Sequence, residues 1–343
     1  MRIRRFSAIA LFIPLFIPWS QPFASEASPA NACSPEHALI HGGSFANAQD
    51  GTRIWYRVAG REDAPVIAYL HGGPGYNSFT FEKSVGPALE ARFRVLYLDQ
   101  RGCGRSRFDG PLDRYGMQHT IEDLEQLREL VGVDRLVLAG HSFGGAVAAE
   151  YATRYPAHTA AVIMIDTTHD LPHALEYQVQ YIDSLADTEF RDSAERIHAI
   201  ASAPGAPMNK LGQMYQAVGR LPLQRKLHFA NAASQERMEA LDRESGLLDC
   251  TSGNAIAALA MQGYLDKALP NVARRLDAPT LLIAGSKSHV IGRANIENAA
   301  KVWGARVEWI DAGHFVYFER PQEFVAAVER FLTQVGVRKD TRR

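Results

Sequence analysis

A serine held between two glycines is the first pattern in this chain that could do chemistry. Gly140-His-Ser-Phe-Gly144 places a glycine two residues to either side of Ser142. Residues 135–139 before it have a strand pattern, and residues 143–155 after it have a helix pattern. A tight strand-to-helix turn exposes a serine hydroxyl for attack on a carbonyl carbon. The turn also places the N–H of Phe143 at a helix N-terminus, where it can stabilise an oxyanion.

The alternative for this pattern is a glycine-rich turn that contains an incidental serine. The strand and helix patterns on either side of the motif favour the nucleophile. A second glycine-rich loop, His71-Gly-Gly-Pro-Gly75, directly follows the apolar run 66–70. Such a loop can direct another backbone N–H, that of Gly73, at the same oxyanion. We expect His71 itself to be structural, and a simple turn is the alternative for the whole loop. The charged loop 99–106 is expected to hold its neighbours by hydrogen bonds.

One of the twelve histidines has the position expected of a general base. His314 lies in Asp311-Ala-Gly-His-Phe315, directly after the strand pattern of residues 307–310. Loops that follow strands meet at the carboxyl edge of a parallel sheet, where α/β folds form their sites. We therefore predict that His314 takes the proton of Ser142.

The elements that must position these residues alternate along the chain. Short apolar runs typical of strands buried on both faces alternate with helical patterns, one of which is expected to begin with Thr120 as its cap. This alternation predicts an α/β fold with a mostly parallel, doubly wound sheet. Residues 167–275 lack a convincing strand, and we interpret them as an inserted helical cap. The expected core is then 33–166 with 276–343.

The N-terminus predicts export. A basic start, Met1-Arg-Ile-Arg-Arg5, precedes a short apolar run that ends near Trp19, and small residues follow, so residues 1–32 are expected to be a signal peptide and leader. Cys33 also allows a lipoprotein interpretation, although no leucine stands three residues before it. We expect a periplasmic or secreted protein. Outside the cytoplasm, three cysteines leave at least one thiol free or in an intermolecular bond.

Composition and charge restrict the partners. The chain has 343 residues, 46% of them hydrophobic, and a net charge of −1, so it lacks the basic excess that nucleic-acid binding needs. No apolar stretch is long enough for a stable membrane span. There is no metal-binding histidine cluster, P-loop or dinucleotide motif, and we expect no cofactor. The expected partner is a small-molecule or short-peptide substrate, and the oligomeric state stays open.

The assembled motifs resemble those of the α/β-hydrolase superfamily over residues 40–335. The pair formed by His71-Gly-Gly-Pro-Gly75 and Asp99-Gln-Arg-Gly-Cys-Gly-Arg-Ser106 resembles the proline iminopeptidase group, serine peptidase family S33. The resemblance implies an α/β-hydrolase fold, with Ser142 as nucleophile, His314 as base and the N–H groups of Phe143 and Gly73 as oxyanion hole. The Gly-His-Ser-Phe-Gly turn departs from the Gly-Gly-Ser-Trp-Gly form usual in that group.

The resemblance leaves the acid of the triad unassigned. Superfamily members usually carry it after the penultimate strand, where this chain has Ser288 and no carboxylate before Glu297. Asp166, which ends the strand pattern 162–165, is our leading substitute, because some relatives keep their acid after this strand. Asp311 is the weaker alternative. An Asp at the position of Asp166 is also found in members with the usual acid.

We therefore expect a serine hydrolase that works through an acyl-enzyme, with prolyl aminopeptidase-like cleavage of small peptides or amides as first expectation. A carboxylesterase is the first alternative, and a catalytically decayed binding protein on the same scaffold is the second. The cap glutamates that bind the substrate amine in the iminopeptidase group cannot be placed in this sequence. Acidic residues at the start of the cap either suit an amine or form solvated helix faces: Asp170, Glu176, Asp183, Asp187, Glu189, Asp192 and Glu195.

Overall fold

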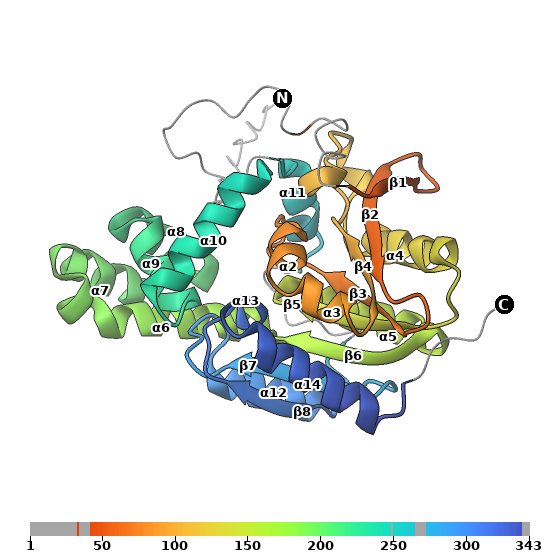
Figure 1. Cartoon of the computed structure of the whole chain (residues 1–343). Helices are drawn as coiled ribbons and strands as arrows, with labels where there is room; N and C mark the ends of the chain where they lie inside the picture. The colour runs from red at the N-terminus through yellow and green to blue at the C-terminus, as the bar shows by residue number, and fades with distance from the viewer. Residues whose placement is uncertain (1–32, 34–41, 248–249, 265–271, 338–343) are drawn as a thin grey trace, which may run out of the picture.

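A computed structural model describes residues 33, 42–247, 250–264 and 272–337. The expected signal peptide, residues 1–32, lies outside the described residues. Within them the strands form one eight-stranded sheet with the order β1-β2-β4-β3-β5-β6-β7-β8 (Figure 1). Its strands are β1 (Ser44–Asn47), β2 (Arg53–Gly60), β3 (Val66–Leu70), β4 (Arg94–Leu98), β5 (Leu136–His141), β6 (Thr159–Ile165), β7 (Thr280–Gly285) and β8 (Arg306–Ile310).

The sheet is mostly parallel, as the alternation of apolar runs and helical patterns predicts. Only the pairs β1–β2 and β2–β4 are antiparallel among the described strands. Strand β3 pairs with both β4 and β5, so the strand order reverses there. In open α/β sheets, ligands bind outside the carboxyl ends of the strands at such a reversal. The two glycine-rich loops follow β3 and β5 and therefore meet at this point.

Helices cover both faces of the sheet because successive strand residues point to opposite sides. Ala68 and Leu70 of β3 belong to one apolar cluster together with α4, α5 and α12. Ile67 and Tyr69 belong to a second cluster together with α2, α3, α13 and α14. The bounds of these helices are α2 (Phe79–Ser84), α3 (Gly86–Glu90), α4 (Met117–Val131), α5 (Phe143–Arg154), α12 (Arg293–Trp303), α13 (Val316–Glu319) and α14 (Pro321–Gln334).

Helix α4 differs from its expected start. It begins at Met117 after Gly116, and Thr120 lies inside it with its hydroxyl donating to the carbonyl of Gly116. The prediction of Thr120 as the cap was therefore wrong by one turn. Short 3₁₀ turns connect several elements: η1 (Gly104–Ser106), η2 (Leu112–Arg114), η3 (Pro156–His158) and η4 (Arg191–Ser193).

The region between β6 and β7 contains helices and no strand among its described residues. Helices α6 to α10 gather beside the sheet, on the left in Figure 1. The inner apolar side chains of α6 to α9 continue the cluster formed with α4, α5 and α12, whereas Met238 of α10 belongs to the second cluster. The bounds are α6 (Leu171–Glu189), α7 (Ala194–Ser202), α8 (Pro207–Val218), α9 (Arg220–His228), α10 (Ala232–Ser245) and α11 (Gly253–Met261). We call residues 167–275 the cap, and its division from the core stays a prediction.

A disulfide joins Cys33 to Cys250, at a sequence separation of 217 residues. Cys103 is a free, buried cysteine, so one thiol of the three stays unpaired. The sulfur of Cys33 is therefore engaged in a bond within the chain. None of the described helices is both long and apolar enough to cross a bilayer.

Candidate active site

Ser142 occupies the turn between β5 and α5 with φ 51° and ψ −120°. A positive φ is strained for a residue with a side chain, and such strain gathers at functional sites. The flanking glycines permit the close approach, since a Cβ on Gly140 would lie 2.3 Å from the carbonyl oxygen of Gly144. A Cβ on Gly144 would lie 2.0 Å from the carbonyl oxygen of Leu70. The sequence thus folds into the predicted strand-to-helix turn, with Ser142 at its tip.

Two backbone N–H groups are available beside Ser142. Phe143 is the first residue of α5, and the first N–H groups of a helix have no partner within it. Gly73 adopts φ +117° in the loop after β3, a conformation that favours glycine. Ser142, Phe143 and Gly73 all line one cavity. The structure thus brings the residues of the expected oxyanion hole to the same cavity as Ser142.

His314 and Asp166 meet although 148 residues separate them in sequence. Nδ1 of His314 lies 2.9 Å from Oδ2 of Asp166, and both side chains are almost fully buried. Asp166 also has a positive φ, 42°; in the described part of the chain, Ser142 and Asp166 are the two non-glycine residues with this conformation. The structure therefore brings the leading substitute acid to the back of the predicted base.

Burial dominates the protonation of this pair. It raises the pKa of Asp166 to about 8, although nearby Ser288 and His289 act in the opposite direction. Burial also lowers the pKa of His314 to about 3, so the ring stays neutral at ordinary pH. A neutral imidazole is the form that can accept a proton from a serine.

The alternative acid, Asp311, lies elsewhere. Its carboxylate is exposed, and it pairs with Lys287 at 2.9 Å and with Arg320 at 3.6 Å. Ser288, at the position usual for the acid, is instead a buried neighbour of Asp166 and lowers the pKa of that carboxyl.

The backbone of His314 is held from two sides. Its N–H donates to the carbonyl of His228 in the cap at 2.7 Å. Its carbonyl lies 3.1 Å from Nε2 of His141, which therefore donates as an N–H. Glu319 extends this connection, because its buried carboxylate accepts from the N–H of Gly313 at 2.9 Å and that of Ala230 at 3.1 Å. The cap is thus bonded to the loop that carries the base.

Sequence reasoning did not identify His141, His228 or Glu319. His141 lies within the serine motif and Glu319 lies five residues after His314, so their proximity to the motifs was the only available signal. His228 has no local signal, because only the folded cap brings it to the base.

The other two loops serve as supports, as expected. His71 accepts from the N–H of Gln100 at 2.9 Å through Nε2, and the Gln100 amide donates to the His71 carbonyl at 2.7 Å. Asp99 is buried, accepts from the N–H of Ser78 at 2.8 Å and pairs with Arg105 at 2.8 Å. His71 and the loop 99–106 therefore fix the loop of Gly73 by hydrogen bonds.

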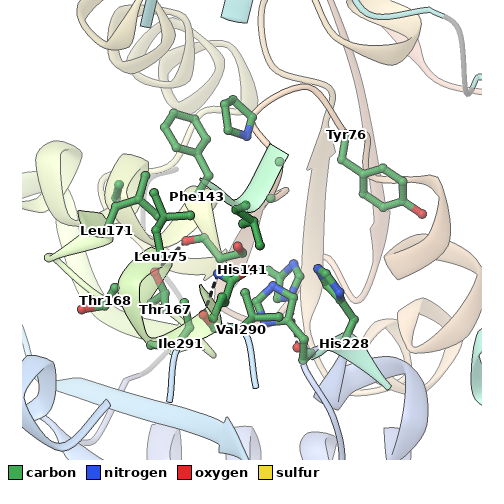
Figure 2. Close-up of a pocket in the computed structure, with 18 of the residues that line it drawn as sticks. Tyr76, His141, Phe143, Thr167, Thr168, Leu171, Leu175, His228, Val290 and Ile291 are labelled. Atoms are coloured by element: carbon green, nitrogen blue, oxygen red, sulfur yellow. Dashed lines mark hydrogen bonds between the residues drawn. The ribbon is translucent and has the colours of Figure 1, made fainter. Parts of the chain in front are cut away.

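The cavity in front of Ser142 has a volume of about 190 Å³. Figure 2 shows Phe143, Leu171 and Leu175 on one side of it and Tyr76 and His228 on the other. No Asp or Glu occurs among its described lining residues, which are Gly72, Gly73, Pro74, Tyr76, His141, Ser142, Phe143, Ala146, Thr167, Thr168, His169, Leu171, Leu175, Gln178, Met208, Leu211, Tyr215, His228, Tyr264, Val290, Ile291, His314 and Phe315. The described residues also contain no group of three side chains suited to hold a metal ion.

The acidic residues at the start of the cap have other roles or face outward. Asp170 caps α6 by accepting from the N–H of His173, and Glu189 pairs with Lys226 at 2.8 Å. Asp242, further along the cap on α10, accepts from the hydroxyls of Tyr76 and Thr80. None of these carboxylates lines the cavity.

The curated proteins that are similar in sequence to this chain include peptidases and an esterase. The chain is 38% identical over 135 residues to a proline iminopeptidase of Saccharolobus solfataricus, a match that covers 38% of this chain and 42% of the relative. It is 32% identical over 178 residues to a bifunctional esterase/perhydrolase of Acinetobacter calcoaceticus, covering 49% and 62%. The chain thus spans less than two thirds of the length of these two relatives.

A solved structure and a family model cover more of the chain. A proline iminopeptidase-related protein from Thermus thermophilus superposes with a TM-score of 0.71 at 22% identity, over 85% of this chain and 97% of that one. At this identity the likeness shows the fold. The family model described as alpha/beta hydrolase fold matches residues 65–321, three quarters of the sequence. The chain therefore belongs to the α/β-hydrolase family and resembles proline iminopeptidases within it.

Proposed function

We propose that this protein is an exported serine hydrolase that acts through an acyl-enzyme. The observation that carries the proposal is the bond of 2.9 Å between His314 and Asp166, beside the cavity that His314 shares with Ser142. A buried carboxylate on Nδ1 orients an imidazole so that Nε2 can accept the serine proton. The strain at Ser142 and Asp166 supports a functional role for both.

The mechanism follows from these positions. Ser142 Oγ bonds to the substrate carbonyl carbon while its proton moves to Nε2 of His314, and the N–H groups of Phe143 and Gly73 stabilise the oxyanion. The bond to the leaving group then breaks as His314 returns the proton to that group. Water next attacks the acyl carbon and gives a proton to His314, and the bond to Ser142 Oγ breaks as His314 passes that proton to Oγ. Asp166 holds the ring and stabilises its charged form.

The cavity supports ester cleavage better than aminopeptidase cleavage. An aminopeptidase must bind a charged amine, and burying an unpaired ammonium costs much free energy. The described cavity residues offer no carboxylate for such an amine. We therefore place the carboxylesterase first. Prolyl aminopeptidase-like activity is the second candidate, because several of the similar curated proteins are named proline iminopeptidases.

Labelling with a fluorophosphonate tests the proposal, because this probe reacts with an activated serine. We expect wild-type protein to be labelled and Ser142→Ala to be inert, whereas Ser202→Ala, on cap helix α7, keeps full labelling. Wild-type protein that is folded but unlabelled would identify the binding protein instead. Turnover of p-nitrophenyl esters is then compared with turnover of proline naphthylamide, to separate esterase from aminopeptidase activity. Faster turnover of the amide would favour the aminopeptidase.

The export proposal rests on the pattern of residues 1–32 and on the disulfide Cys33–Cys250, since disulfides persist in oxidising compartments. Cell fractionation with N-terminal sequencing of the mature protein tests it. We expect a cut before Cys33 and recovery outside the cytoplasm. A full-length cytoplasmic protein would contradict the proposal.

A further inference from the structure

Several polar side chains of the cavity are already bonded within the protein. The Thr167 hydroxyl donates to the carbonyl of Ser142 at 2.6 Å, and the Gln178 amide donates to the carbonyl of Val290 at 2.9 Å. The Thr168 hydroxyl accepts from the N–H of Asp170 at 3.1 Å. These groups therefore have partners before any substrate binds.

His169 is different. It lines the cavity and is only 6% exposed, yet its Nδ1 is buried without a hydrogen-bond partner. Nε2 is not sealed in this way, and within the described part of the chain it has no hydrogen bond either. Burial lowers the pKa of this ring, which therefore stays neutral and carries one N–H donor and one acceptor nitrogen. An imidazole left unsatisfied in the interior costs free energy and calls for an explanation.

The ring of His169 is held close to the reacting groups. It packs edge-on against buried Trp303, with the ring centres 5.8 Å apart. It stands two residues after Thr167, which is bonded to the Ser142 carbonyl, and three after Asp166. The ring thus has a buried aromatic neighbour and lines the same cavity as Ser142.

The surrounding wall is apolar. Leu171 and Leu175 of α6, Met208 and Leu211 of α8, and the pair Val290 and Ile291 line the same cavity. No Lys or Arg occurs among the described lining residues, so a charged group on the substrate would lie there unpaired. A cavity with this lining favours an apolar chain that carries one uncharged polar group.

We propose that His169 is a specificity-determining residue that hydrogen-bonds an uncharged oxygen substituent, such as an ether or ketone, in the apolar acyl group of an ester substrate. This inference rests on the proposed function, because it assigns the acyl group of the same site. Because Nδ1 is sealed, the donor is the N–H at Nε2, and the aliphatic side chains contact the rest of the acyl chain.

A series of ester probes tests the proposal. The parent is p-nitrophenyl hexanoate, and each analogue replaces one CH₂ of the acyl chain by an ether oxygen at successive positions beyond the carbon next to the carbonyl. kcat/KM is measured for wild type, His169→Phe and His169→Gln, and the ratio of variant to wild type cancels the intrinsic reactivity of each ester. We expect His169→Phe to lose about five- to tenfold on one ether isomer relative to hexanoate. His169→Gln, which keeps an N–H donor, is expected to retain part of the preference.

The outcomes are distinct. Equal losses of His169→Phe on hexanoate and on every ether analogue would assign a packing role to His169 and overturn the proposal. A wild type without preference for any ether position would overturn it as well, without any variant. Fluorophosphonate labelling of Ser142 distinguishes failure of this inference from failure of the proposed function. Labelled protein without ether selectivity would contradict only the role of His169. Unlabelled protein would contradict the proposed hydrolase activity.

Discussion

At the scale of single residues, backbone strain and burial coincide at the candidate triad. Ser142 and Asp166 have positive φ, and Asp166 and His314 are buried together. Burial raises the pKa of Asp166 and lowers that of His314, so both side chains favour their neutral forms more than free side chains do. Two predictions follow from this environment.

Above pH 8, where the carboxyl of Asp166 is ionised, replacing Asp166 by Asn is expected to lower kcat by about 10⁴-fold, because the amide no longer favours the tautomer in which Nε2 can accept a proton. Ser142 labelling and kcat are measured on the same preparation. Asp311→Asn is the matched control, since this carboxylate is exposed and pairs with Lys287 and Arg320. Asp166→Asn with unchanged turnover would show that another group orients His314.

The rate is expected to fall as pH drops below about 8, because the carboxyl of Asp166 has a pKa of about 8. A protonated carboxyl donates to Nδ1 and leaves the ring proton on Nε2, which then cannot accept from Ser142. The pH profile of kcat/KM measures this limb. Since Ser288 lowers the pKa of Asp166, Ser288→Ala should move the limb to higher pH. A limb that persists unchanged in Asp166→Asn would assign it to another group.

At the scale of elements, the loop after β8 is fixed by bonds that reach the cap. His228 at the end of α9 accepts from the N–H of His314, and Glu319 of α13 accepts from both Gly313 and Ala230. The packing there is close, since a Cβ on Gly313 would lie 2.3 Å from the carbonyl oxygen of His228. The cap therefore takes part in positioning the base.

Glu319→Ala leaves the N–H groups of Gly313 and Ala230 without their acceptor. We expect the free energy of unfolding to fall by about 2–4 kcal/mol, since each buried unsatisfied group costs about 1–3 kcal/mol. kcat should fall by up to about 100-fold, with a smaller change in KM, because a displaced base misses its geometry. Glu319→Gln keeps one acceptor oxygen and should lose less.

The matched control for Glu319 is Glu323→Ala, because this carboxylate is 58% exposed and lies 3.7 Å from Arg320. Chemical denaturation and steady-state kinetics on the three variants give the comparison. Equal stability and equal kcat of Glu319→Ala and Glu323→Ala would show that Glu319 does not connect the cap to the loop of the base.

At the scale of the whole molecule, the disulfide Cys33–Cys250 connects the start of the described chain to the segment after α10. Thr251, the next residue, donates its hydroxyl to the carbonyl of Gly75 in the loop that holds Gly73. The bond thus restrains a segment that touches the candidate oxyanion hole.

Cys250→Ser is expected to lower the free energy of unfolding by about 2–4 kcal/mol, because opening a long loop increases the entropy of the unfolded chain. Cys33→Ser should have a similar effect, and the double variant should be no less stable than either single variant. Thermal and chemical denaturation measure all three. Additive losses would mean that each cysteine stabilises the fold by packing and not through the bond.

The sequence by itself determined the sheet, the turn of Ser142, the loop of Gly73 and the position of His314. Each depends on local rules: apolar runs make buried strands, two glycines allow a tight turn, and a histidine after a strand reaches the carboxyl edge. Only the tertiary structure decided which carboxylate lies behind His314, because Asp166 and Asp311 both follow strands of the sheet and differ in burial. It also decided the contacts of His228, the lack of a partner for His169 within the described chain and the pairing of Cys33. These features depend on which residues meet across long stretches of sequence, and no local sequence pattern predicts such meetings.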